Sequence, residues 1–401
     1  MRRSKQRQLE QSFESAVPGL LNGLTLSGCL RKMHAPAELH GSFCSVCSKV
    51  LRPQPSRQNL QPRLRSHQRR YSTKQQRMAV CPQAVSAPEA PPSKAPPAEV
   101  TIRRRAPAGS STQPCGQFTF KVPQNDGEEP QNKLEEIVWY KAKEIEDMKY
   151  IMPTERLAVM MKAAPPPRDF IGALKAKAEA TGRPALIAEV KKASPSKGVI
   201  QPNFDPAKIA KAYEAGGAAC ISVLTCARYF QGSFDNLLAI RKAGVNCPLL
   251  CKEFVVEAYQ LFKARACGAD AVLLIAAVLP NKDLQYLMRA ARKIKLQILL
   301  EVHSIGELER VLQLDLEGTM LGINNRDLQT FEVDLDNSKI ILSSPAGQEA
   351  QRRGLLFAGE SGIFTPEHVT HAQQAGCQAI LVGESLVKES DQAAAVRQLL
   401  A

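Results

Sequence analysis

The chain has 401 residues, 44% of them hydrophobic, and a formal net charge of +14 at pH 7. The charge is unevenly distributed: up to Arg105 there are 19 Lys and Arg against 5 Asp and Glu, whereas the remainder carries 34 of each. A neutral remainder argues against nucleic acid or an anionic membrane surface as its partner. No apolar run approaches the roughly 20 residues that cross a bilayer.

The basic N-terminal segment is rich in Arg, Ser, Gln and Pro, and Glu38 is its only acid between Glu14 and Glu89. This composition is typical of an organelle transit peptide. We therefore expect residues 1–105 to be a transit peptide with a disordered basic linker, and residues 106–132 to continue the linker. The alternatives are a basic tail that stays attached and an RNA-binding arm.

Helical periodicity begins at Lys133, where Leu134, Ile137, Val138, Lys141 and Ile145 fall near one helical face. The pattern predicts an additional helix in front of the main domain.

Eight short apolar runs follow, each succeeded by a stretch with helical spacing. They start at Ala185, Cys220, Pro248, Ala271, Gln297, Thr319, Gly354 and Ala379. Continuous apolar runs predict parallel strands that are buried on both faces. Eight of them favour a (β/α)8 TIM barrel over residues 133–401 rather than an open doubly wound sheet, since the glycine fingerprint of the open sheet is missing after the first strand.

Two of the intervening helices have clear end signals. Asp205 with Pro206, and Thr365 with Pro366, are typical of helix starts, and Gly216 and Gly376 are expected to end these helices.

Polar residues interrupt the strands near their carboxyl ends, where the active site of this fold is built. They are Glu189, Lys191, Lys252, Glu301, Asn324, Arg326 and Ser361. Any one of them could be a solvated rim residue or half of a structural ion pair. Several cations and carboxylates that converge at one end of a barrel cost desolvation free energy, which indicates a chemical function for the set.

The last two strands end in glycine-containing turns, Gly359–Gly362 and Gly383–Ser385. Backbone amides in such turns after strands seven and eight bind phosphate in many barrels, which makes Ser361, Gly362, Gly383 and Glu384 candidate phosphate ligands. Glycine in a turn is also common for geometric reasons alone.

Taken in order, the motifs IAEVKKASPSKG, ISVLTCARYFQGS, CKEF, LLEVH, GINNRDL and ESGI resemble the indole-3-glycerol phosphate synthase family, over roughly Lys133 to Ala401. The resemblance implies a carboxy-lyase of tryptophan biosynthesis. Its substrate would be 1-(2-carboxyphenylamino)-1-deoxyribulose 5-phosphate, which undergoes ring closure, decarboxylation and dehydration. No metal or organic cofactor is expected.

By motif position, the resemblance implies that Lys252 is the general acid of ring closure and that Lys191 binds the substrate carboxylate. Which of the two lysines serves in dehydration is left open by the sequence. Glu301 would be the partner acid or base, with Glu189 and Asn324 positioning the substrate hydroxyls. A desolvated lysine near other cations is expected to have a lowered pKa, which would favour proton donation, while the adjacent glutamates keep it charged until it donates.

The same resemblance implies the substrate contacts. Arg326 suits a bidentate grip on a carboxylate. Phe230 and Phe254 match aromatic residues that pack against the substrate ring, although core packing would also explain them. Ser194 and Pro195 belong to a flexible loop after the first strand.

Three residues depart from the common family pattern, namely Cys226, Glu253 and Glu384. A carboxylate at position 384 would repel phosphate unless only its amide faces the ligand. A plastid address is expected from the N-terminal segment, with the mitochondrion as the alternative. Transient contact with other tryptophan-pathway enzymes is expected, and no nucleic-acid or membrane partner.

Overall fold

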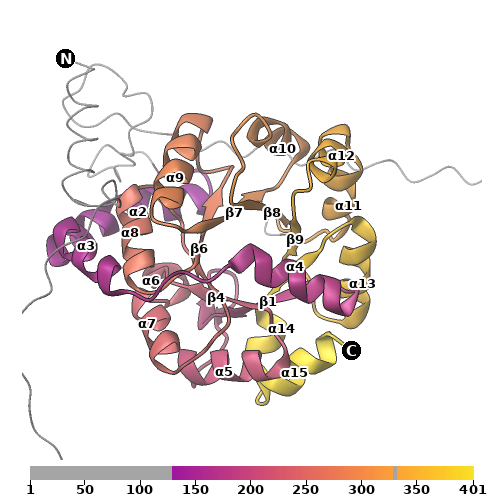
Figure 1. Ribbon diagram of the computed structural model, residues 1–401, viewed down its shortest axis with the longest axis horizontal. Helices are drawn as coiled ribbons and strands as arrows, with labels where there is room; N and C mark the ends of the chain where they lie inside the picture. The colour runs from indigo at the N-terminus through magenta and orange to yellow at the C-terminus, as the bar shows by residue number, and fades with distance from the viewer. Residues whose placement is uncertain (1–128, 328–331) are drawn as a thin grey trace, which may run out of the picture. The chain divides into compact units, whose positions relative to one another are not determined.

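The computed structural model describes residues 129–327 and 332–401 (Figure 1). The expected transit peptide at 1–105 and most of the expected linker at 106–132 lie outside these residues.

Eight parallel strands close into a barrel in the order β1-β10-β9-β8-β7-β6-β5-β4. Their bounds are β1 Ala185–Val190, β4 Cys220–Leu224, β5 Leu249–Lys252, β6 Ala271–Ile275, β7 Gln297–Val302, β8 Thr319–Asn324, β9 Phe357–Glu360 and β10 Ala379–Val382. Each expected apolar run contains one of these strands. The predicted (β/α)8 barrel is confirmed, and its closure brings the carboxyl ends of all eight strands to one rim.

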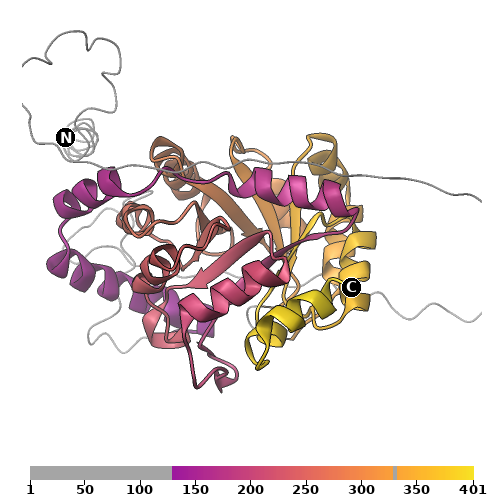
Figure 2. The ribbon, with the colours of Figure 1, turned by 60° about the horizontal axis from the view of Figure 1, so that its bottom comes forward.

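The helices surround the strands on the outside (Figures 1 and 2). Their bounds are α2 Lys133–Ile151, α3 Thr154–Ala163, α4 Phe170–Thr181, α5 Pro206–Gly216, α6 Ala227–Phe230, α7 Phe234–Lys242, α8 Ala258–Ala266, α9 Asn281–Lys293, α10 Ile305–Val311, α11 Asp336–Ser343, α12 Pro345–Arg352, α13 Pro366–Ala375, α14 Glu384–Val387 and α15 Gln392–Leu399. A short hairpin of β2 Ala193–Ser194 and β3 Gly198–Val199 lies in the loop after β1.

The additional N-terminal helix is confirmed as α2. Asn132 caps it by accepting a hydrogen bond from the amide of Glu135, which satisfies one of the amides left free at a helix start. The five residues expected on one face are all buried.

Helix α4 closes the opposite end of the barrel from the site. Phe170 and Leu174 are fully buried, and the amides of Arg168 and Ile171 donate to Asp270 and Gln297, at the starts of β6 and β7.

The expected helix ends are partly corrected. Asp205 caps α5 as expected, but Gly217, not Gly216, takes the left-handed conformation, with φ 107°. Gly216 is the last residue of the helix, and its lack of a side chain permits close packing, because a Cβ there would lie 2.7 Å from Cβ of Val396 on the neighbouring helix α15. Thr365 holds the cap position of α13 without a side-chain hydrogen bond, and Gly376 ends that helix at φ 104°.

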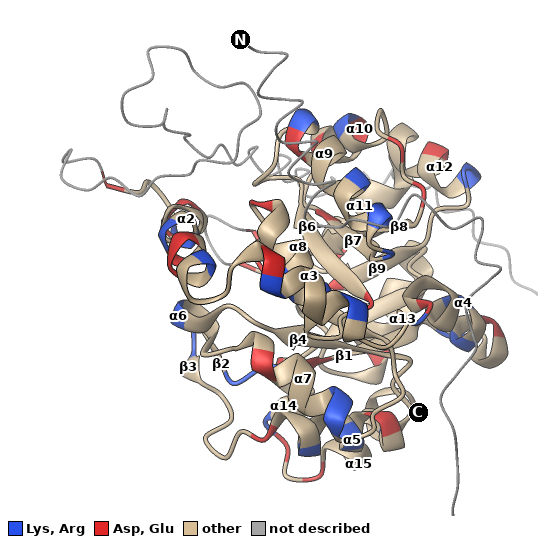
Figure 3. Cartoon of the chain, turned by 60° about the vertical axis from the view of Figure 1, so that its left-hand side comes forward, with Lys and Arg blue, Asp and Glu red and all other residues tan. Residues whose placement is uncertain are grey.

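On the outer helices, basic and acidic residues are mixed (Figure 3). Among the described residues, no helix combines the length and the apolar character that spanning a bilayer requires.

Candidate active site

A pocket opens at the carboxyl ends of the barrel strands. Every residue that the sequence predicted for the site lines it: Glu189, Lys191, Ser194, Pro195, Phe230, Lys252, Phe254, Glu301, Asn324, Arg326, Ser361, Gly362, Gly383 and Glu384. The barrel brings these residues together because every strand delivers its polar terminal residue to the same rim.

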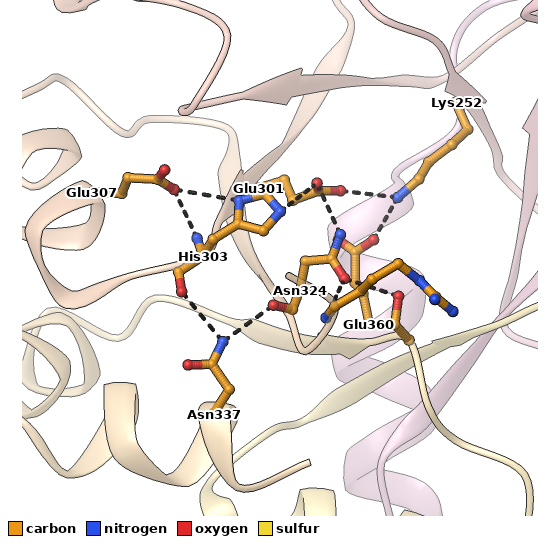
Figure 4. Close-up of polar contacts among 9 residues, drawn as sticks. Lys252, Glu301, His303, Glu307, Asn324, Asn337 and Glu360 are labelled. Carbon is orange, nitrogen blue, oxygen red and sulfur yellow. Dashed lines mark hydrogen bonds and ion pairs between the residues drawn. The ribbon is translucent and has the colours of Figure 1, made fainter. Parts of the chain in front are cut away.

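Lys252, the last residue of β5, lies at the centre of the charged groups (Figure 4). Its Nζ donates to Oε2 of Glu301 at 3.2 Å and also to Oε2 of Glu360. The Lys252 side chain is only 13% exposed, so these carboxylates provide most of the compensation for its buried charge.

Glu360 is a candidate site residue that sequence reasoning missed. It ends β9, is 2% exposed and lines the pocket. The sequence made its neighbours Ser361 and Gly362 candidate phosphate ligands but indicated no role for Glu360. The available signal was Gly322 inside β8, because a Cβ there would lie 2.1 Å from Oε1 of Glu360.

The electrostatics correct the expectation of a lowered lysine pKa. Burial opposes the charged form of Lys252, but the carboxylates of Glu360, Glu301 and Glu189 outweigh it and raise the pKa above its ordinary value. Burial also opposes the charged form of Glu301, yet the neighbouring Lys252 and His303 hold its pKa below the usual range.

Glu360 differs from Glu301 in its protonation. Burial raises the pKa of Glu360 to about 7, with the nearby Glu301 adding to the rise and Lys252 opposing it. Around neutral pH the pocket thus contains a charged lysine, an ionised carboxylate and a carboxyl group that can retain its proton.

Glu189 and Lys191 point the same way, as expected for residues two apart at a strand end. Nζ of Lys191 donates to Oε1 of Glu189 at 2.6 Å. Gly383 makes room for the pair, because a Cβ at this position would lie 2.4 Å from Oε1 of Glu189 and 3.0 Å from Nζ of Lys191.

Asn324 connects the Glu301 carboxylate to the turn after β9 that contains Ser361. Its Nδ2 donates to Oε1 of Glu301 at 3.2 Å. Its Oδ1 accepts from the Ser361 hydroxyl at 2.8 Å and from the Arg326 amide at 3.0 Å. The hydroxyl of Ser361 therefore already donates its hydrogen to another residue of the protein.

An apolar wall faces these charges. The rings of Phe230 and Phe254 lie 6.1 Å apart between centroids with a 35° tilt. Leu134 and Ile137 of α2 also line the pocket, whereas the sequence predicted only that they share one face of a helix. The wall and the charged groups together suit a substrate that is aromatic at one end and anionic at the other.

Glu384 is one of the three residues that depart from the common family pattern. Its carboxylate is paired with Lys197, a cation that the sequence did not predict for the site. Nζ of Lys197, in the loop after β1, donates to Oε1 of Glu384 at 2.8 Å. This contact offsets the carboxylate charge beside the turn.

Cys226 and Glu253 belong to a buried cluster rather than to the charged centre. Oε1 of Glu253 lies 2.9 Å from Nζ of Lys141 on α2, and Oε2 accepts from the Thr225 hydroxyl at 3.0 Å. Sγ of Cys226 lies 3.6 Å from the same lysine nitrogen. Neither of these two departures from the family pattern removes one of the charged groups around Lys252.

Within residues 129–327 and 332–401, no three His, Cys, Asp or Glu side chains gather as the ligands of a metal ion would.

A closed parallel barrel with lysines and carboxylates around an open pocket defines a TIM-barrel enzyme whose pocket holds groups suited to acid–base chemistry. The family model that matches residues 134–399 is described as indole-3-glycerol phosphate synthase. The chain belongs to the indole-3-glycerol phosphate synthase family.

Relatives agree with this assignment. The chain is 51% identical over 293 residues to the chloroplastic indole-3-glycerol phosphate synthase of Arabidopsis thaliana, covering 73% of this chain and 72% of that protein. It is 48% identical over 299 residues to the indole-3-glycerol phosphate synthase of Rippkaea orientalis, covering 74% and 99%. Among solved structures, a tryptophan synthase alpha chain from Legionella pneumophila matches with a TM-score of 0.42 and 16% identity, over 58% of this chain and 94% of that one.

Proposed function

We propose that the pocket catalyses ring closure of 1-(2-carboxyphenylamino)-1-deoxyribulose 5-phosphate, with Lys252 as the general acid. Family membership makes the chain a carboxy-lyase with indole-3-glycerol phosphate synthase activity in tryptophan biosynthesis. The observation that supports the residue assignment is the buried ammonium of Lys252 between Glu301 and Glu360.

In the first step, the aromatic carbon that bears the carboxylate attacks the ketone carbon of the sugar chain. The new carbon–carbon bond pushes the carbonyl electron pair onto oxygen, and Lys252 gives that oxygen a proton. The raised pKa of Lys252 keeps the proton available until the oxyanion, a stronger base than an amine, develops.

In the second step, the bond to the carboxylate breaks, CO2 leaves, and the electron pair of that bond restores the aromatic ring. Lys191 and Arg326 hold the carboxylate until this point, the arginine through its planar fork. Phe230 and Phe254 pack against the aromatic ring and exclude water from it.

Dehydration completes the reaction. The hydroxyl formed in the first step leaves as water after taking a proton from Lys191, while Glu301 accepts a proton from the adjacent ring carbon. Glu189 and Asn324 position the hydroxyls of the sugar chain, and the loop with Ser194 and Pro195 closes over the bound substrate.

The terminal phosphate binds at the turns after β9 and β10, through the amides of Ser361, Gly362, Gly383 and Glu384. Because the Ser361 hydroxyl donates to Asn324, Ser361 contributes its backbone amide. The Glu384 carboxylate remains on Lys197 and away from the phosphate.

The direct test supplies the carboxyphenylamino substrate to the purified full chain and follows indole fluorescence. We expect product formation without added metal or cofactor, and no conversion of phosphoribosylanthranilate, the substrate of the pathway isomerase. A folded protein that converts only phosphoribosylanthranilate would overturn the proposal.

We propose import into the plastid, in keeping with the chloroplastic relative and the basic segment at 1–105. A fusion of residues 1–105 to a fluorescent protein should accumulate in plastids, and accumulation in mitochondria would establish the alternative. Transient contact with other tryptophan-pathway enzymes belongs to the same proposal, as does the lack of a nucleic-acid or membrane partner.

A further inference from the structure

His303 directly follows β7 and is almost buried, with 8% of its side chain exposed. It lies two residues after Glu301 and points to the same side of the chain (Figure 4). Its Nε2 lies 3.3 Å from Oε1 of Glu301, and its Nδ1 lies 3.4 Å from Oε2 of Glu307 on α10. Nothing in the mechanism above uses this residue.

The two contacts indicate the charge of the imidazole. Neither ring nitrogen makes a hydrogen bond to a residue that the structure describes, so the two contacts are ion pairs, and a protonated imidazole compensates both buried carboxylates where a neutral one would not. The charged or titratable groups that face it are Glu301 from β7 and Glu307 from α10, with Lys252 of β5 beyond Glu301. Burial opposes protonation, but these two carboxylates outweigh it and raise the pKa of His303 to about 9.

The surroundings fix the residue in place. Its backbone amide donates to Oε2 of Glu307 at 2.7 Å, and its backbone carbonyl accepts from Asn337 of α11 at 3.3 Å. Asn337 also donates to the backbone carbonyl of Asn324 at 3.1 Å. The backbone of His303 is therefore held from α10 and α11, and its imidazole lies between Glu301 and Glu307.

The contact matters because Glu301 and Glu360 both lie against Lys252. Oε1 of Glu301 accepts a hydrogen bond from Asn324 and lies at ion-pair distance from Nε2 of His303. Oε1 of Glu360 is buried without a hydrogen-bond partner among the described residues. The two carboxylates thus differ in the groups that stabilise their ionised forms.

We propose that His303 is a positioning residue for the lyase reaction: as an imidazolium fixed by Glu307, it keeps Glu301 ionised and directs the shared proton of the carboxylate pair to Glu360. The proposal rests on the role proposed above for Glu301 as acceptor of a proton. It makes Glu301 the base and leaves Glu360 as the protonated partner.

The activity test uses His303→Gln, which retains a donor of similar reach and removes the charge. In this variant the proton that the carboxylate pair holds below about pH 7 should move from Glu360 to Glu301, so that kcat at pH 6 falls about tenfold relative to wild type. At pH 8.5 kcat should lie within about threefold of wild type, because Glu301 is ionised there in both proteins. A variant whose kcat falls by one factor at every pH would show a merely structural role and overturn the proposal.

The matched control is His371→Gln, since His371 contacts Asp336 at 3.2 Å but its side chain is 36% exposed. Its profile should coincide with that of wild type. Glu301→Gln separates the two proposals: if it retains full kcat, the proposed role of Glu301 fails, whatever His303 does.

A second measurement does not depend on activity, and its first part uses only the wild-type protein. The chain has six histidines, and ¹⁵N NMR of the full-length wild-type protein should show one buried imidazole with both nitrogens protonated from pH 6 to 8. Glu307→Gln should lower the titration midpoint of that imidazole. A buried imidazole that is neutral at pH 7 would overturn the proposal.

Discussion

Two glycines decide where the carboxylates of the site can lie. A Cβ on Gly322 would collide with Glu360, and a Cβ on Gly383 would collide with Glu189. Both glycines lie in or directly after a barrel strand, where a residue without a side chain weakens the packing. Their position is explained by the room that a buried carboxylate needs.

The pH dependence of stability tests the environment of Glu360. In the folded protein burial raises its pKa to about 7, whereas an unfolded carboxyl ionises near 4.5. Protonation therefore favours the folded state, and this contribution, present below pH 4.5, is lost as the pH rises to 7. In urea unfolding, the unfolding free energy of Glu360→Gln should increase relative to that of wild type between pH 5 and pH 8. A constant difference across that range would contradict the assignment.

The sequence predicted the residues of the site better than their protonation. Strand-end residues such as Lys252 and Glu301 could be found because a closed barrel brings all strand ends together. The raised pKa of Lys252 could not be found, since it depends on carboxylates from β7 and β9 whose direction only the fold determines. Glu360 was missed for the same reason, as its partner is 108 positions away.

Among the secondary-structure elements, α2 is joined to the barrel by a buried ion pair. Lys141 is fully buried, contacts Glu253 next to Lys252, and also contacts Glu144 of its own helix. The same helix contributes Leu134 and Ile137 to the pocket wall. The periodicity predicted the buried face of α2 but could not show that its lysine meets a carboxylate of the barrel.

Removing one partner of that pair should destabilise the fold. Lys141→Met leaves Glu253 buried without its cation, which typically costs about 3–5 kcal/mol of unfolding free energy. The double variant Lys141→Met with Glu253→Leu should recover most of the loss. The measurement is urea unfolding of both variants, and a single variant within about 1 kcal/mol of wild type would refute the importance of the pair.

The two turns after β9 and β10 predict inhibition by inorganic phosphate. Phosphate should raise the apparent KM and leave kcat unchanged, because it occupies only the phosphate end of the pocket. Ser361→Ala retains the backbone amide, so the inhibition constant for phosphate should stay within about twofold. Inhibition that lowers kcat without changing KM would place the phosphate site elsewhere. Gly362 is less suitable for this test, since its φ is 80° and a Cβ would lie 2.5 Å from Val333.

For the whole chain, the charge split predicts that the N-terminal segment is dispensable for catalysis. The helix cap at Asn132 and the amide of Gln131, which donates to Glu135, mark the start of the structured contacts that we describe. A variant that begins at Gln124 retains these contacts and should show normal kcat and KM. If that shorter protein were folded but inactive, the transit-peptide interpretation would be wrong.

The most direct test of the proposed mechanism is Lys252→Met, which removes the ammonium and preserves most of the side-chain volume. Loss of a general acid typically lowers the rate by roughly 10²–10⁴, about 3–5 kcal/mol of barrier. We expect kcat for the carboxyphenylamino substrate to fall by this factor. KM should change far less, because the carboxylate and phosphate contacts come from other residues, and the circular dichroism spectrum should remain that of a folded barrel. A folded variant whose kcat lies within threefold of wild type would contradict the role of Lys252 as the acid of ring closure.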